Sequence, residues 1–149
     1  MAQVKAVPDG YGTATPFLNI KGAADAIDLY TKAFGAEERA RMAGPNGVIM
    51  HAEIKIGNSV IMIAEAMMNP PTQSSIHLYV DDVDSWWKRA TATGMTVAMP
   101  LADMFWGDRY GVLSDKFGNR WAIATHKEDV SEADMGVRAA EAMKQMPKP

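Results

Sequence analysis

Two pairs of polar residues stand out in the sequence because their side chains could do chemistry together. His51 and Glu53 are two residues apart in a stretch of alternating apolar and polar residues, and His77 and Tyr79 are two apart in another. Alternate residues of a β-strand point to the same side of a sheet, so each pair predicts two neighbouring functional groups. An imidazole beside a carboxylate can transfer protons or bind a metal ion, and an imidazole beside a phenol can orient an organic ligand. Either pair could equally be an ordinary polar sheet face.

A further group of candidate residues lies in a predicted loop over residues 101–109. Arg109 could bind a carboxylate or phosphate of a ligand through two parallel hydrogen bonds, or it could form a structural ion pair with Asp108. Trp106 and Phe105 are predicted to line the mouth of a pocket, although aromatic residues also serve in cores and interfaces. The loop therefore adds one possible anion-binding group and an apolar cover.

Residues 74–94 contain the element that must position His77 and Tyr79. Apolar residues alternate with these two side chains, which predicts a strand with one apolar and one polar face. These apolar residues are Ile76, Leu78 and Val80. Asp82 then suits the first cap position of a helix, and Gly94 suits the end of that helix. His77 and Tyr79 are therefore expected on the sheet face that points away from the helix.

The same order of elements is predicted twice, about sixty residues apart. Residues 15–35 and residues 75–94 each read as a strand followed by a helix, and residues 48–65 and 110–125 each read as a hairpin with a Gly-Asn turn. Short strands complete each unit over residues 37–42 and 96–99, the second ending at Pro100. The fold class is therefore α+β, with two βαβββ modules. His126, at the end of the last strand, is interpreted as an ordinary residue.

One domain of two modules accounts for the whole chain. The 149 residues, of which 48% are hydrophobic, suit a single domain with a sizeable core. The predicted parts are an N-terminal arm over 1–14, the first module over 15–65, a linker over 66–74, the second module over 75–126 and a C-terminal helical tail over 127–149. Ser131 is expected to cap the helix of that tail, which would dock on the body or on a partner.

Composition excludes several classes of function. The net charge is -3 and Lys and Arg are scattered, which argues against a nucleic acid as partner. The chain has no cysteine, so disulfides, thiolate metal sites and a cysteine nucleophile are excluded. No apolar run is long enough for a membrane span, and the N-terminus lacks the pattern of a secretion signal. We therefore expect a cytoplasmic protein with no membrane association.

Four motifs together resemble the vicinal oxygen chelate superfamily, which includes glyoxalases, bleomycin-resistance proteins and extradiol dioxygenases. The segments Leu78–Val83 and Asp115–Trp121 carry the resemblance to the superfamily, and Phe105–Gly111 and Ala124–Asp129 resemble its PhnB-like branch. The similarity covers about residues 15–130. It implies that the sheets of the two modules curl around a shared pocket.

The resemblance also implies where a metal ion would be held. Metal-dependent members take one ligand from the first strand and one from the last strand of each module. Aligned on the two Gly-Asn turns, these positions fall on Thr15, Ile61, Ser75 and Ala122. None of these is a good ligand for a divalent ion. A shift of two residues would bring His77 to one position. We therefore expect no metal ion and no cofactor.

The resulting hypothesis is a metal-independent protein that binds a small organic molecule and forms a homodimer. The apolar linker around Met67 and Met68 and the C-terminal helix are the surfaces that the partner chain would cover. The candidate ligand-binding residues are Thr15, Phe17, Asn19, His51, Glu53, Ser75, His77, Tyr79, Trp106, Arg109 and Ala122. The alternative is a metal-dependent lyase, isomerase or dioxygenase of the glyoxalase type, with a displaced ligand set drawn from the histidines and Glu53. A third possibility is an assembly subunit with an empty pocket.

Overall fold

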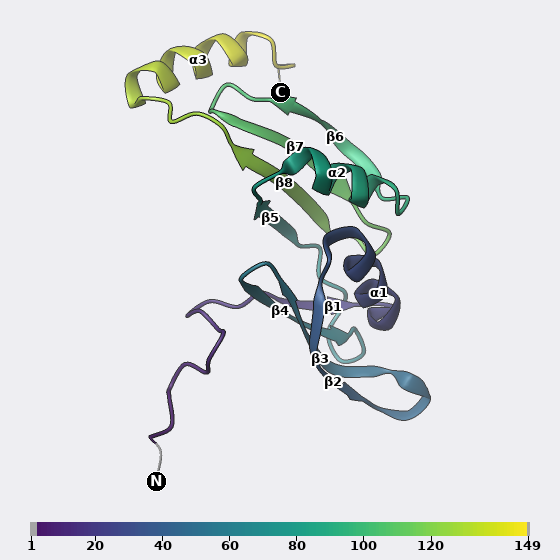
Figure 1. Ribbon diagram of the computed structural model, residues 1–149. Helices are drawn as coiled ribbons and strands as arrows, with labels where there is room; N and C mark the ends of the chain where they lie inside the picture. Colours follow the sequence, from purple (N-terminus) through teal and green to yellow (C-terminus); the bar gives the residue numbers. More distant parts are fainter. Residues whose placement is uncertain (1–2, 149) are drawn as a thin grey trace.

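The computed structural model describes residues 3–148 and contains two four-stranded sheets and three α-helices (Figure 1). The first module consists of β1 (Phe17–Ile20), α1 (Ala23–Phe34), β2 (Glu37–Ala43), β3 (Ile49–Ile56) and β4 (Ser59–Glu65). The second consists of β5 (Ser75–Tyr79), α2 (Val83–Thr91), β6 (Thr96–Asp103), β7 (Asp108–Ser114) and β8 (Arg120–His126). A last helix, α3 (Glu132–Lys144), follows. The predicted α+β fold of two βαβββ modules is confirmed.

The two sheets have the same topology. Their strand orders are β1-β4-β3-β2 and β5-β8-β7-β6, and the first and last strand of each module pair in parallel. Leu18 lies opposite Ile63 in the first sheet, and Leu78 lies opposite Ile123 in the second. Positions sixty residues apart are therefore equivalent along these strands.

The core lies on the helix side of both sheets, and it joins the modules. The ring of Trp121 from β8 lies 4.7 Å from that of Tyr30 and 4.8 Å from that of Phe34, both on α1. On β5, Ile76 and Leu78 pack against this core, while the alternating residues Ser75, His77 and Tyr79 are exposed. The predicted assignment of the faces of β5 is therefore confirmed.

A buried network of hydrogen bonds joins α1 to the turn before β8. Asp115 accepts hydrogen bonds from the Tyr30 hydroxyl (2.6 Å) and from the Trp121 indole (3.0 Å). Asn119 is fully buried and its side chain accepts the backbone N–H of Ser74 at 3.0 Å. Burial, followed by the charge of Asp115, holds the pKa of Tyr30 well above its ordinary value. Each donor in this network has a partner, so the buried polar groups stabilise the interface.

Two of the three described α-helices begin with a side-chain cap from a neighbouring residue, and the third does not. Asp82 accepts the N–H of Ser85 at the start of α2, and Ser131 accepts the N–H of Asp134 at the start of α3, as predicted. The start of α1 has no such cap of its own. There the carboxylate of Glu65, at the end of β4, accepts the N–H of Gly22 at 2.8 Å and so supplies the missing acceptor.

Strand β6 differs from the prediction. It continues through Pro100 to Asp103, so the expected loop over 101–109 is wrong for its first three residues, and β7 begins at Asp108. β6 lies at the edge of its sheet, and its pairing with β7 shifts between Met99 and Ala102. Because a proline has no N–H to donate, an edge strand with an irregular register can accommodate it.

The two ends of the described chain are not part of the sheets. Residues 3–14 form neither helix nor strand, and they contact the first module at Tyr11, whose ring lies 5.2 Å from the guanidinium carbon of Arg39 on β2, before extending away from it toward the N-terminus (Figure 1). Helix α3 has no buried residue and is attached through Arg138, which binds Glu128 and the carbonyl oxygen of Phe105. No helix within residues 3–148 is long and apolar enough to cross a membrane.

Candidate functional site

Each sheet has one side that the chain's own helices do not cover. We call the side of the first sheet that carries Phe17 and His51 the first open face. The side of the second sheet that carries His77 and Tyr79 is the second open face. Strand alternation assigns these residues, since their neighbours Leu18 and Leu78 pack in the core.

A row of four rings crosses the second open face. The ring of Tyr79 lies 4.6 Å from that of His77, which lies 5.6 Å from that of Tyr110. Tyr110 in turn lies 5.2 Å from Trp106, in an edge-to-face arrangement. Tyr79 is 65% exposed although it belongs to this cluster. The row therefore presents aromatic surface to solvent.

Asp108 accepts hydrogen bonds from the residues at both ends of this row. The residue is 2% exposed, and its Oδ2 atom accepts hydrogen bonds from the Tyr79 hydroxyl at 2.9 Å and from the Trp106 indole at 3.0 Å. Its Oδ1 atom lies 2.7 Å from Nδ1 of His126. Burial raises the pKa of Asp108, but the hydrogen bonds from His126, Tyr79 and Trp106 outweigh it and the pKa lies below its ordinary value. The carboxylate is therefore ionised at neutral pH.

His126 lies between two carboxylates. Its Nδ1 faces Asp108 and its Nε2 lies 2.7 Å from Asp129, so only the protonated ring can donate to both. The pKa of His126 is raised by Asp129 and then by Asp108. The pKa of Tyr79 is raised as well, chiefly by its hydrogen bond to Asp108. When His126 is protonated, the cluster holds a cation beside a buried anion.

The first open face is more loosely organised. The Phe17 and His51 rings lie 5.8 Å apart, and His51 Nε2 lies 3.5 Å from Glu53 Oε2. A hollow of about 400 Å³ opens beside Phe17 and Asn19. Its lining includes the methionines Met50, Met67 and Met68. This face therefore combines a flexible apolar surface with one polar pair.

The structure separates the predicted site residues into groups. His77 and Tyr79 border a hollow of about 680 Å³ beside the Gly57–Ser59 turn, which is distinct from the hollow at Phe17. Leu78, Val80 and Trp86 also line the hollow beside the turn, so it lies along the edge of β5 and not over the ring row. Thr15 lies just before β1, and Ser75 is the first residue of β5. Ala122 is buried and lies opposite His77.

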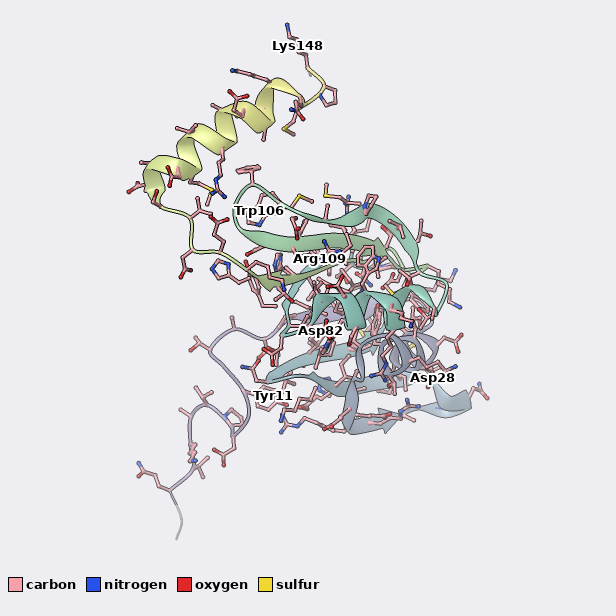
Figure 2. The ribbon with its side chains drawn as sticks, turned by 45° about the horizontal axis from the view of Figure 1, so that its top comes forward. Tyr11, Asp28, Asp82, Trp106, Arg109 and Lys148 are labelled. Carbon is pink, nitrogen blue, oxygen red and sulfur yellow. The ribbon has the colours of Figure 1, made fainter. Side chains whose placement is uncertain are left out.

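Arg109 lies on the helix side of its sheet. Its guanidinium binds Asp84 of α2 at 3.0 Å and Asp103 at 3.3 Å, and not Asp108 as the sequence suggested. Two residues further along β7, Gly111 lies beneath Trp87 of α2, where a Cβ atom would come within 2.5 Å of the ring. Arg109 therefore does not share a face with His77. Figure 2 labels Arg109 and Trp106 in the second module.

The residues at the expected metal positions do not fit a divalent ion. Ile61 is 2% exposed and faces the core, because the turn before β4 has two residues while that before β8 has five. The equivalent of Ala122 is therefore Met62, which lies opposite Phe17. Within residues 3–148, no cluster of three or more His, Cys, Asp or Glu residues could hold a metal ion.

Sequence reasoning missed Asp108 as an acceptor, Tyr110 as a ring of the row and the role of His126. Interpreting His126 as ordinary is wrong, because it bridges two carboxylates. The only local signal was the proximity of Trp106 to Asp108 in the sequence. Tyr79 and His126 reach Asp108 through the pairing of β5, β7 and β8, which no local pattern reveals.

The fold defines a class of protein in which two βαβββ modules each leave one face of a sheet uncovered by the helices of the chain. Residues 13–123 match the family model of the Glyoxalase/Bleomycin resistance protein/Dioxygenase superfamily, and the chain belongs to this superfamily. It is 39% identical over 129 residues to the uncharacterized protein Rv0887c of Mycobacterium tuberculosis, covering 78% of this chain and 76% of that protein.

Solved structures of low sequence identity share the fold. A PhnB protein from Bacillus cereus has a TM-score of 0.62 at 21% identity, covering 76% of this chain and 99% of that one. TnmS3 from Streptomyces sp. CB03234, described as an antibiotic binding protein, has a TM-score of 0.61 at 20% identity, covering 78% and 98%. These likenesses establish the architecture.

Proposed function

We propose that this protein binds a small, planar organic molecule without a metal ion. The observation that carries the proposal is the row of four rings on the second open face, from Tyr79 to Trp106, with both ends held by one buried carboxylate. Aromatic rings attract flat apolar molecules through offset or edge-to-face packing, and polar groups nearby orient them. The description of TnmS3 as an antibiotic binding protein supports a ligand-binding role on this fold.

The proposed contacts come from both open faces. On the second face they are His77, Tyr79, Trp106 and Tyr110, with Ser75 and Ala122 at its margins. On the first face they are Thr15, Phe17, Asn19, His51 and Glu53. Arg109 is left out of this set because it binds Asp84 on the helix side.

A homodimer would bring the two faces together. Both carry exposed apolar residues, with Phe17 44% and Tyr79 65% exposed, and the linker residue Met68 is 96% exposed. In a twofold dimer, the first open face of one chain could lie against the second open face of its partner, which would form two equal pockets. Sedimentation at micromolar concentration should give the mass of two chains, and the mass of one chain would contradict this arrangement. The cytoplasm is the proposed location, in line with the lack of cysteine.

A fluorescence titration tests ligand binding. Proflavine, a planar fluorescent cation, should bind saturably to the purified protein, and the double variant His77→Ala/Tyr110→Ala should bind it at least about tenfold more weakly, because it lacks the middle of the ring row. Tyr11→Ala, a change on the N-terminal arm, is the matched control and should bind like the wild type. Equal binding by the double variant and the wild type, with both folded, would contradict the proposal.

The alternative of a metal-dependent lyase, isomerase or dioxygenase has one supporting observation, the closeness of His51 to Glu53. Metal addition separates the two functions. Because tight binding to the native state stabilises it by mass action, Zn²⁺, Ni²⁺ or Mn²⁺ added to chelator-free protein would raise the melting temperature of an enzyme with a metal site. We expect no rise. A rise that is lost in the double variant His51→Ala/His77→Ala would favour the enzyme.

A further inference from the structure

We propose that Asp108 sets the hydrogen-bonding preference at the Tyr79 end of the second open face: by accepting the hydroxyl proton of Tyr79, it leaves the Tyr79 oxygen as an acceptor toward the ligand, so that planar aromatic molecules that place an N–H or O–H donor there are preferred. The proposal rests on the proposed ligand-binding function. Asp108 acts here through Tyr79 and Trp106 and is a positioning residue.

The direction of each hydrogen bond in the cluster is fixed by chemistry. An ionised carboxylate can only accept, so the Tyr79 hydroxyl and the Trp106 indole must both donate to Oδ2 of Asp108. The pKa of Asp108, lowered by His126, Tyr79 and Trp106 against the effect of burial, agrees with the ionised state. The hydroxyl proton of Tyr79 and the only polar hydrogen of the Trp106 side chain are thus already used within the protein.

The cation of the cluster is also fully engaged. His126 has a carboxylate oxygen at 2.7 Å from each ring nitrogen, one from Asp108 and one from Asp129. It therefore offers no free N–H to a ligand while both contacts hold. The three donor side chains around Asp108 therefore all pair with carboxylates, and His126 pairs in addition with the exposed Asp129.

The group that Tyr79 itself keeps available is an acceptor, beside the imidazole of His77, which can both donate and accept. The hydroxyl oxygen of Tyr79 keeps its lone pairs, and Tyr79 borders both the hollow of about 680 Å³ and a second one of about 410 Å³. The exposed carboxylate residue Asp81 borders both hollows too. A ligand that stacks on the rings and carries a donor can pair with these oxygens, whereas a ligand with acceptors alone leaves them unpaired.

A matched pair of probes measures this preference. 2-Naphthol and 2-methoxynaphthalene have the same planar ring system, but only 2-naphthol has an O–H donor. The wild type should bind 2-naphthol about five- to tenfold more tightly, which corresponds to one hydrogen bond. Asp108→Leu frees the Tyr79 hydroxyl to donate, so the affinity ratio should fall to below about threefold. Asp108→Asn, in which one side-chain oxygen still accepts, should restore most of the ratio.

The affinity ratio distinguishes selection from a merely structural role. If Asp108 only supports the fold, Asp108→Leu weakens both probes equally, the ratio is unchanged and the proposal is overturned. Tyr79→Phe provides a second measurement should Asp108→Leu fail to fold. It keeps the ring and removes the Tyr79 oxygen but leaves Asp81, so the ratio should fall to below about threefold, while Tyr11→Phe on the arm should keep the wild-type ratio. If the wild type binds neither naphthalene nor proflavine, ligand binding itself fails. If it binds both naphthalenes equally, only the selection by Asp108 fails.

Discussion

The two modules repeat one backbone plan sixty residues apart, yet their open faces are held in different ways. Phe17 and His77 are equivalent positions, since the residues that follow them, Leu18 and Leu78, pair with Ile63 and Ile123. On the first face, Phe17 meets only the ring of His51 at 5.8 Å among aromatic groups. On the second face, His77 is the centre of a row of rings whose ends share Asp108.

This difference shows how one fold can provide a rigid and an adaptable half of a site. A buried carboxylate with three donors fixes ring orientations before a ligand arrives, which lowers the entropy cost of binding. The first face instead borders a hollow lined by Met50, Met67 and Met68, and methionine side chains adapt their shape readily. We therefore expect the second face to decide specificity and the first to accommodate variation.

The hairpin turns before the last strand of each module also differ between the two modules, in length and in the contacts that they make. The longer turn before β8 carries Asp115 and Asn119, which form the buried network with Tyr30 of the first module. In the two-residue turn Gly57–Asn58, Asn58 is exposed and its side chain accepts a hydrogen bond from its neighbour Ser59, and a hollow of about 680 Å³ remains between this turn and the end of β5. The turn that is three residues longer is thus packed against the other module, whereas the shorter turn borders a hollow.

The largest effect should come from the cores of the two first strands. Leu18 is 2% exposed while its equivalent Leu78 is half-buried, so Leu18→Ala should cost about 2–5 kcal/mol of unfolding free energy and Leu78→Ala less than Leu18→Ala. His77→Ala, on the open face beside Leu78, should stay within about 0.5 kcal/mol. Chemical denaturation measures all three. A silent Leu78→Ala together with a damaging His77→Ala would mean that the faces of β5 are reversed.

A smaller difference should separate the acidic residues of the two open faces. Asp108→Ala leaves Tyr79 and Trp106 without their acceptor and should cost about 1–3 kcal/mol of stability. Glu53→Ala removes a carboxylate that meets His51 at 3.5 Å near the surface, and should stay within about 0.5 kcal/mol. Urea denaturation provides the comparison. Equal costs for the two variants would contradict a fixed second face and a loose first face.

The smallest effect should be a dependence of stability on pH through His126. Its raised pKa means that the folded state binds its proton more tightly than the unfolded state, so this stabilisation is complete below about pH 6.5 and is lost as pH rises through the raised pKa. The lowered pKa of Asp108 has the opposite sign and is felt only in acid, where stabilisation is lost as pH falls. The melting temperature of the wild type should therefore fall from neutral to alkaline pH by more than that of His126→Gln. The same pH dependence in both proteins would remove His126 from the network.

The sequence by itself determined the module plan, because that plan follows from local periodicity. Alternation of apolar residues in β5 reflects burial of one sheet face, and helical spacing placed α1 at Ala23–Phe34 as observed. Ser131 could be assigned as a cap because a hydroxyl that accepts an N–H three residues later depends only on neighbouring residues. These features need no knowledge of the rest of the chain.

Tertiary structure decided which functional groups meet. Asp108 receives Tyr79 from β5 and His126 from β8, and only the register of three paired strands brings them together. Arg109, one residue beyond Asp108, points to the other side of the sheet and binds α2. Turn length moved Ile61 into the core and Met62 onto the open face. Because successive side chains of a strand alternate between faces, a single-residue difference in register changes the members of the site while leaving the fold unchanged.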